Sequence, residues 1–388
     1  MENEVNFLPT SKPVVYAIDA ESANKPKRTG VEEYAFQLIQ AMKREPLREG
    51  ERVFLYSPTP LVGPLAELPM GWESRVLAWK LPRGWMQGRV TWELLRRPPR
   101  AFFVPSQGLP RFFSGVPVLT TIHDVAFRRI GRFYHPATRR RLASITKRSI
   151  KNASRLLTVS EFTKQELRDL YHVRDERITV TPLAADADVY RRLDRQIVEE
   201  TLRKHRLGHT FFLFVGRLEK KKNVAVLIRA FELFKQNRGV GDPFELVLVG
   251  TPGYGYDEIK TYIERSSQRE LIRETGYLPD QDVAALMNVA TAFCFPSLYE
   301  GFGIPNVEAM ACGAPLLTSD LPVHREVVGD AAIFIPSGEA EAWAKQMDLL
   351  VGDSLLREHL VEKGSVRASQ FNWKHTAQLT WSTLRSLL

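Results

Sequence analysis

The chain has 388 residues, 44% hydrophobic and 26% charged, which is typical of a soluble globular protein with two domains of ordinary size. No apolar run approaches the roughly 20 residues that a bilayer-spanning helix needs, and the N-terminus lacks a basic, apolar leader, so we expect a cytoplasmic protein. The net charge is +9, and residues 81–160 alone carry 16 basic and 2 acidic side chains. A positive field of this kind attracts an anionic membrane surface, nucleic acid or phosphorylated ligands. The alternative is that these residues form only a solvated basic face.

The first half of the chain alternates apolar strands with helices. A buried strand at 14–18, a polar loop ending at Gly30 and an amphipathic helix at 31–43 are typical of the phosphate-facing end of a doubly wound unit. No GxGxxG motif occurs, so a dinucleotide cofactor is not indicated. The other expected elements are strands at 52–56, 101–104, 118–122, 155–159 and 177–181 and helices at 136–152 and 162–171.

The pattern then restarts beyond a boundary that we place near residues 186–191. A polar helix at 191–206 leads to residues 211–215, a strand so apolar that we expect it at the centre of a second sheet. Further strands are expected at 244–249, 272–276, 291–295, 315–318 and 332–335, and helices at 224–236, 256–270, 280–289 and 339–351.

This alternation predicts an α/β fold of parallel sheets with helices on both faces. We expect two doubly wound, Rossmann-like domains, residues 1–188 and 189–371, that face an interdomain cleft, which is a preferred ligand position. A final helix within residues 372–388 would cross back to complete the first domain.

The stretch 294–319 is the main candidate for a ligand site. Pro305 stands where a short helix should begin and Gly313 lies just past its end. Glu300 precedes that helix and Glu308 lies in its first turns, so both can border the cleft beyond the carboxyl end of a strand. The alternative is that Glu308 only complements the helix dipole and Glu300 is a solvated loop charge.

A basic loop, GRLEKKKN at residues 216–223, follows the expected central strand directly. Arg217 can make a forked bond to a diphosphate while a lysine adds a point charge, although four cations in six residues also suit a solvated loop. His123, at the end of the strand 118–122, could be a general base, a hydrogen-bond donor to a sugar, or a turn former.

Three other features favour structural roles. Ser160 precedes a helix and is interpreted as its N-cap rather than as a nucleophile. Residues 250–255, which hold three glycines, are interpreted as a turn, with a ligand loop as the alternative. The histidines show no ligand-like spacing, so no catalytic zinc is predicted, and Cys294 and Cys312 lie in apolar segments that suit a reducing cytosol.

Glu300 and Glu308 are separated by seven residues, with GFGIP between them and EAMACGAP after them. This pattern resembles the E-x7-E signature of the retaining GT-B glycosyltransferases of family 4. The resemblance covers most of the chain, through the Thr29-Gly30 loop, TIHD ending at Asp124, LLTVSEFTK ending at Lys164, VGRLEKKKN ending at Asn223 and GYLPD ending at Asp280.

The resemblance implies a role for each matching position. Glu300, with the backbone of Phe302 and Gly303, would hold the hydroxyls of the donor sugar, and Glu308 would accept from the ribose hydroxyls. Arg217 and Lys222 would neutralise the leaving diphosphate, so neither a metal nor another cofactor is implied. His123 would lie near the reacting carbon, and Gly30 and Gly216 would lie at the phosphates. The other implied donor-binding residues are Leu278, in the loop 276–280 that would line the base, and Ile304. Where the family often has paired glycines in its first loop, this chain has only Gly30.

The implied function is retaining transfer of a hexose from a nucleotide-diphosphate sugar, as in bacterial mannosyltransferases of surface-polysaccharide synthesis. GDP-mannose is the first expectation for the donor and UDP-glucose or another UDP-sugar the second. No side chain is evident as a covalent nucleophile, which favours front-face retention. A non-catalytic subunit or a sugar-nucleotide epimerase on the same fold stays open, because fold alone does not settle function.

The expected acceptor is a glycan or a lipid-diphosphate-linked glycan, and no nucleic-acid partner is expected. The positive field of the first domain predicts peripheral attachment to an anionic inner membrane face, with a soluble acceptor as the rival hypothesis. The cations on one predicted helix that support attachment are Arg139, Arg140, Arg141, Lys147, Arg148 and Lys151.

Overall fold

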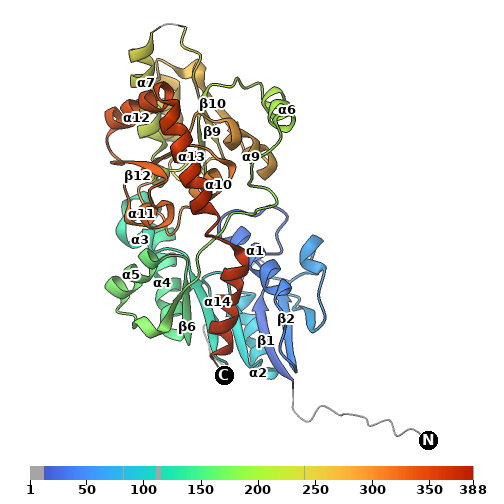
Figure 1. The fold of residues 1–388 in the computed structure, drawn as a ribbon. Helices are drawn as coiled ribbons and strands as arrows, with labels where there is room; N and C mark the ends of the chain where they lie inside the picture. The colour runs from blue at the N-terminus through green and yellow to red at the C-terminus, as the bar shows by residue number, and fades with distance from the viewer. Residues whose placement is uncertain (1–12, 82, 111–114, 240, 388) are drawn as a thin grey trace, which may run out of the picture.

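The structure is a computed structural model that describes residues 13–81, 83–110, 115–239 and 241–387. Its N-terminal half, the lower part of Figure 1, contains a seven-stranded parallel sheet in the order β3-β2-β1-β4-β5-β6-β7. The strands are β1 (Val14–Asp19), β2 (Glu51–Ser57), β3 (Trp72–Val76), β4 (Ala101–Val104), β5 (Val118–Ile122), β6 (Arg155–Thr158) and β7 (Ile178–Val180).

The C-terminal half contains a six-stranded parallel sheet in the order β10-β9-β8-β11-β12-β13. Its strands are β8 (Phe211–Val215), β9 (Glu245–Val249), β10 (Ile272–Gly276), β11 (Ala292–Phe295), β12 (Leu316–Ser319) and β13 (Ala332–Ile335). As predicted, the apolar sequence FFLFV forms the central strand, because a strand covered on both faces must be apolar at every position. The two doubly wound parallel sheets confirm the predicted fold class.

Both sheets reverse their strand order at one point, between β1 and β4 in the first and between β8 and β11 in the second. Open α/β sheets bind ligands beyond the carboxyl ends of the strands at such a switch point. The loop that follows β8 holds residues 216–223, and the loop that follows β11 holds residues 296–303. The fold therefore brings the two loops of the predicted site side by side.

Helices cover both faces of each sheet. In the first half, α2 (Thr91–Arg96), α4 (Pro136–Asn152) and α5 (Glu161–Tyr171) pack on one face through a separate apolar cluster, and α1 (Val31–Arg44) packs on the other. The main apolar cluster continues from α1 into the second half. The remaining helices are α3 (Ala126–Arg129), α6 (Arg195–His205), α7 (Val224–Arg238), α8 (Tyr256–Arg265), α9 (Asp280–Val289), α10 (Ile304–Cys312), α11 (Pro322–Val328), α12 (Ala340–Gly352), α13 (Ser354–Ala368) and α14 (Trp373–Arg385).

The last helix, α14, crosses back to the first half, as Figure 1 shows. Trp381 is 1% exposed, and its indole N–H donates to the Met42 carbonyl at the end of α1. Arg385 donates to both carboxylate oxygens of Glu51 at the start of β2. The chain thus closes on its own N-terminal sheet. We propose a division into two domains at residues 1–188 and 189–371, with residues 372–388 added to the first.

Two expected helices have other limits in the structure. The helix predicted at 191–206 begins only at Arg195, since Arg191 lies in the connection between the halves, where its carbonyl accepts from Asn288. The helix predicted at 256–270 ends at Arg265, and a short 3-10 turn fills residues 269–271. Strand β3 and helices α2, α3, α11 and α13 were not predicted.

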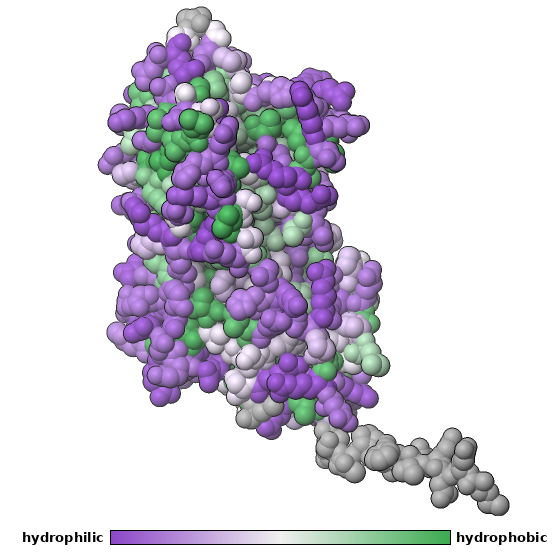
Figure 2. All heavy atoms as spheres, in the orientation of Figure 1, coloured by the Kyte–Doolittle hydropathy of each residue, from purple (hydrophilic) through white to green (hydrophobic). Residues whose placement is uncertain are grey.

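Both cysteines are free and buried, as expected. Within the residues that the structure describes, no helix is both long and apolar enough to cross a membrane. On the face drawn in Figure 2, hydrophilic side chains dominate and apolar ones form small separate areas.

Candidate functional site

An ion pair joins the two loops at the switch point of the second sheet. The Lys222 ammonium donates to Glu300 Oε1 at 2.5 Å, and both side chains are only 13 to 14% exposed. Lys222 also lies over the ring of Phe295, 5.0 Å from its centroid. It is placed by a short turn at Lys220–Lys222, which ends at Asn223 in the left-handed conformation that asparagine tolerates best after glycine.

The Glu300 carboxyl is held in its ionised form. Burial by itself raises the pKa, but the ammonium groups of Lys222 and Lys221 outweigh burial and bring the pKa below its ordinary value. Glu300 is therefore a carboxylate at neutral pH. Its lone pairs can accept from hydroxyl groups, and it cannot act as an acid there.

Lys221 turns toward the first half of the molecule. Burial lowers its pKa, yet Asp124, Tyr134 and Glu219 together with Glu300 more than compensate, and the pKa lies above its ordinary value. Its ammonium lies 5.7 Å from the centroid of the Tyr134 ring. Lys221 thus stays charged at the junction of the two sheets.

Arg217 is exposed, and it forms no ion pair with another part of the chain that the structure describes. Its aliphatic stem lies against Gly253, where an added Cβ would come within 2.7 Å of the Arg217 Cγ. At Gly250 an added Cβ would lie 2.0 Å from the Gly216 carbonyl oxygen. The glycine-rich segment 250–255 therefore makes room for the basic loop, a function that the interpretation as a plain turn did not foresee.

Glu308 lies on α10 among other carboxylates. Burial, followed by the charges of Asp280, Glu33 and Asp186, raises its pKa to about 8. Burial, followed by the charges of Glu33 and Asp186, also raises the pKa of Asp280. This acidic cluster joins residues from both halves and the connection between them, so the sequence spacing could not reveal it.

His123 is held at the end of β5. Its Nε2 donates to the Pro105 carbonyl at 3.0 Å, which leaves Nδ1 as an acceptor, and the Tyr34 ring meets it edge-on at 4.6 Å. Burial lowers the pKa of His123 below its ordinary value, so the imidazole is neutral at pH 7. The histidine directly borders the loop 296–303, because an added Cβ at Gly301 would lie 1.9 Å from the His123 carbonyl oxygen.

The other predicted positions differ in what they can present to a ligand. Gly30 caps α1 with φ of 50°, and no atom lies within 4 Å of an added Cβ, so backbone is exposed there. Gly303, with φ of 84°, begins α10 directly before Ile304. Phe302 and Leu278 are 3 and 6% exposed and belong to the apolar core, so they can meet a ligand only through backbone.

Two buried polar side chains beneath Gly303 were missed by the sequence reasoning. Asn306 is fully buried, and neither of its amide atoms has a partner among the described residues; the same holds for His324 Nε2. Both side chains come within 3.4 Å of an added Cβ at Gly303. Burial lowers the pKa of His324 to about 4, so it is neutral. Buried polar groups of this kind are usually satisfied by ordered water.

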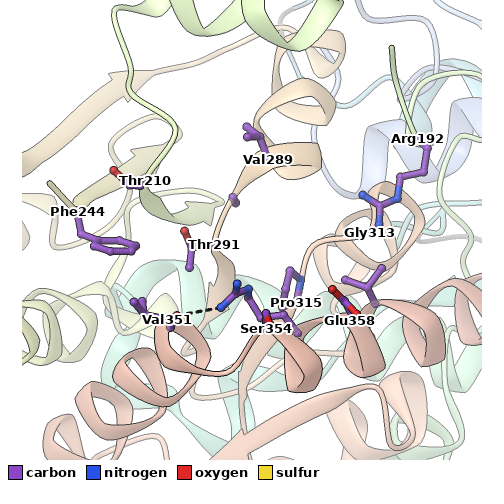
Figure 3. Close-up of a pocket in the computed structure, with 13 residues that line it drawn as sticks. Arg192, Thr210, Phe244, Val289, Thr291, Gly313, Pro315, Val351, Ser354 and Glu358 are labelled. Carbon is purple, nitrogen blue, oxygen red and sulfur yellow. Dashed lines mark hydrogen bonds between the residues drawn. The ribbon is translucent and has the colours of Figure 1, made fainter. Parts of the chain in front are cut away.

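A hollow of about 470 Å³ lies elsewhere, as Figure 3 shows. Its lining includes Thr210, Phe244, Thr291 and Pro315, which directly precede β8, β9, β11 and β12. It therefore lies at the amino ends of these strands, away from the switch-point loops. No set of three or more His, Cys, Asp or Glu side chains suited to a metal ion occurs in the described ranges.

Comparison with known proteins shows what the whole chain is similar to. The model of the family described as glycosyl transferases group 1 matches residues 198–367, and that of glycosyltransferase family 4 matches residues 28–189. O-antigen chain mannosyltransferase B of Escherichia coli is 32% identical over 301 residues, which are 77% of this chain and 77% of that protein. The serotype-specific mannosyltransferase WbdA of Escherichia coli is 26% identical over 61% of this chain, but the match is only 29% of its own length.

Two solved structures share the architecture. Anabaena Alr3699/HepE in complex with UDP-glucose superposes with a TM-score of 0.74 at 17% identity, covering 96% of this chain and 99% of that chain. WaaG, a glycosyltransferase involved in lipopolysaccharide biosynthesis, gives a TM-score of 0.73 at 17% identity and covers 95% and 99%. At these identities the likeness shows the fold, which is the GT-B fold.

Proposed function

The chain belongs to the group 1 glycosyltransferases of family 4, and on that premise we propose that it moves a hexose from a nucleotide-diphosphate sugar to a glycan acceptor with retention of configuration. The observation that carries this proposal is the Lys222–Glu300 pair at the switch point, on a loop that also carries the exposed Arg217. One carboxylate that accepts from hydroxyls, flanked by fixed cations, suits a sugar joined to a diphosphate.

The proposed roles follow from the charges. Arg217 and Lys222 stabilise the departing diphosphate, and Glu300 accepts hydrogen bonds from the donor sugar. Glu308 accepts from the ribose, and the neutral His123 accepts from the sugar through Nδ1. Backbone at Gly30, Gly216, Leu278, Phe302, Gly303 and Ile304 completes the donor contacts.

The proposed mechanism needs no covalent nucleophile. As the anomeric C–O bond breaks, its electron pair goes to the diphosphate oxygen, and positive charge develops on the sugar ring. Fixed cations at that oxygen stabilise this transition state more than the ground state. The acceptor hydroxyl attacks the same face, and the departing phosphate takes its proton. Closure of the two halves excludes water that would otherwise hydrolyse the donor.

GDP-mannose is the first candidate donor, because a mannosyltransferase is the relative at 32% identity. A UDP-sugar is the second, because HepE holds UDP-glucose on the same fold. A thermal-shift screen of GDP-mannose against UDP-glucose separates them, since a ligand that binds only the folded state raises the melting temperature. An epimerase would instead change the sugar nucleotide without any acceptor, and a non-catalytic subunit would form no product.

Donor binding is expected to release a proton from Glu308. The pKa is about 8 in the free protein, so the carboxyl is mostly protonated at pH 7, whereas the ribose hydroxyls favour the carboxylate. Affinity for GDP should therefore rise about tenfold per pH unit from pH 6 toward pH 8. Calorimetry in buffers of different ionisation enthalpy measures the released proton. A flat pH profile would exclude the ribose role of Glu308.

The same shift has a consequence for stability. The folded pKa of about 8 lies above the ordinary value of 4.5, so the stabilising contribution is complete below pH 4.5 and is lost as the pH rises through 8. Glu308→Gln should thus melt at a higher temperature than the parent chain at pH 8 and at nearly the same temperature at pH 4.5. Equal melting temperatures at pH 8 would contradict the raised pKa.

We further propose that the first half attaches to an anionic membrane surface, which would give access to a lipid-diphosphate-linked acceptor. The cations Arg139, Arg140 and Arg141 on α4 are exposed. Trp92 and Leu95 on α2 are 57 and 59% exposed, and α2 packs on the same apolar cluster as α4. Exposed aromatic and aliphatic side chains among cations suit the interface of an anionic bilayer.

Vesicle sedimentation tests this attachment. Binding to anionic vesicles is expected at low salt and should weaken at high salt, because salt screens exposed charges. Replacing Arg139, Arg140 and Arg141 by alanine should weaken binding about 100-fold, from about 1 kcal/mol per cation. The matched control replaces three exposed cations of the second half, namely Arg195, Arg203 and Lys345. Absence of binding at low salt would favour a soluble acceptor.

A further inference from the structure

Helix α5 of the first half contacts the backbone of the loop that carries Glu300. The Gly301 carbonyl accepts from Ser160 Oγ at 2.6 Å and from Thr163 Oγ1 at 3.1 Å, and both hydroxyls are buried. Ser160 is also the N-cap of α5, as predicted, because its Oγ accepts from the Thr163 N–H. One hydroxyl therefore fixes the start of α5 and the residue after Glu300 at once.

A second contact reaches the residue before Glu300. The Tyr299 hydroxyl donates to Glu166 on α5 at 3.2 Å, and the tyrosine is 6% exposed. Glu166 is itself held by the Arg129 guanidinium through bonds of 2.7 to 3.1 Å to both oxygens. Forked bonds of this kind fix the orientation of a carboxylate as well as its position. The flanks of Glu300 on both sides are thus hydrogen-bonded to the first half.

A third contact joins a side chain of the second half to backbone of the first half. Glu326 on α11, in the second half, accepts from the N–H groups of Glu161 and Phe162 at 2.7 and 2.8 Å. These are free N–H groups in the first turn of α5, where a carboxylate also complements the helix dipole. Glu326 therefore holds α5 in the position from which Ser160 and Glu166 reach the loop 296–303.

We propose that Ser160, Thr163 and Glu166 are positioning residues for donor transfer, acting across the domain junction on the backbone around Glu300. The donor-sugar contacts are then complete only when α5 is docked, although the nucleotide end of the donor site does not depend on it. This inference rests on the proposed function of Glu300. It also gives a reason for glycine at position 301, because the missing Cβ lets this loop approach the His123 carbonyl just after β5.

The coupling has a direct kinetic consequence. Transfer falls steeply when reacting groups are displaced by about 1 Å, on the order of 100-fold. Loss of one α5 contact should therefore lower kcat, while the affinity for GDP, which uses Glu308 and the loop 276–280, stays within about threefold of the parent. A merely structural role would instead lower the melting temperature and leave the kcat of the folded fraction unchanged.

Two variants each remove one hydroxyl without altering the cap of α5, although the Thr163 hydroxyl also lies 3.1 Å from Ser160 Oγ and 3.4 Å from the His123 carbonyl oxygen. Tyr299→Phe deletes only the hydroxyl that reaches Glu166, and Thr163→Val replaces one donor to the Gly301 carbonyl by a side chain of similar shape. Each should lower kcat with GDP-mannose about 10- to 100-fold. Ser160→Thr should keep most of the activity that Ser160→Ala loses. The matched control is Gln165→Ala, which changes an exposed side chain on the same helix.

Hydrogen exchange supplies a readout that needs no turnover. Peptides covering residues 298–303 should exchange faster in Tyr299→Phe and Thr163→Val than in the parent chain, and Gln165→Ala should leave them unchanged. If the two variants exchange faster but the parent chain itself transfers no mannose from GDP-mannose, the proposed donor is rejected and the positioning contacts are kept. Unchanged exchange in both variants, or parent-like kcat in both, would overturn the inference.

Discussion

Arg217→Ala should lower kcat/KM by about 100- to 1,000-fold while the protein stays folded. The guanidinium is exposed, and it is the cation of the basic loop that the structure leaves without a carboxylate partner within the described ranges. Lys220 pairs with Glu258, Lys221 with Glu219 and Lys222 with Glu300. Removing Arg217 therefore deletes charge at the departing diphosphate and breaks no internal pair. Steady-state kinetics with GDP-mannose and a thermal melt measure the two effects.

Two further variants separate charge from geometry. Arg217→Lys keeps the charge but loses the forked bond, so its activity should lie between those of the parent and the alanine variant. Lys220→Ala removes a neighbouring cation that faces Glu258 and should retain nearly full activity. Parent-like turnover in Arg217→Ala would remove this residue from the diphosphate site.

Lys222→Met should affect both folding and transfer. Breaking a buried ion pair by removing one partner costs about 3 to 5 kcal/mol, and here we expect about 3 kcal/mol because Lys221 still faces Glu300. Transfer should fall at least as far as in Arg217→Ala, because the same ammonium both holds Glu300 and faces the leaving group. Chemical denaturation and kinetics at pH 7.5 give the two values.

The double variant tests whether the pair acts as a unit. In Lys222→Met with Glu300→Gln, the buried charge left by the first change is removed, so much of the lost stability should return. Transfer should stay as low as in either single variant. Additive losses of stability would mean that Lys222 and Glu300 do not interact in solution.

Much of the fold follows from local patterns in the sequence. The run FFLFV was expected to be a fully covered strand and is one, and Pro305 and Gly313 mark the ends of a short helix. Strand β3 was missed because it lies at the edge of its sheet, where WESRV places three consecutive polar residues between Trp72 and Val76 and offers neither an apolar run nor a polar–apolar alternation. Helix α13 was missed because Gly364 resembles a helix break, although it allows close packing against Met310 of α10.

The site was predictable where one loop carries the chemistry. The spacing of Glu300 from Glu308 and the cations after β8 are visible in the sequence, but the ion pair between Lys222 and Glu300 was not predicted and appears only in the structure. Contacts between segments that lie far apart in the sequence could not be predicted in this way. Gly301 contacts Ser160, which lies 141 positions earlier in the sequence. Glu326 contacts Phe162 and Glu161, which lie 164 and 165 positions earlier. The carboxylates that raise the pKa of Glu308 likewise come together only in the folded chain.

We propose that this chain transfers mannose from GDP-mannose with retention. The direct measurement is to incubate it with GDP-mannose and a lipid-diphosphate-linked mannose-terminated glycan, and to read the new anomeric centre from its one-bond carbon–hydrogen coupling. We predict an α-linked mannose, formed from the α-linked donor, and no product from Arg217→Ala. A β-linked product, or conversion of GDP-mannose that proceeds equally well without the acceptor, would contradict the account.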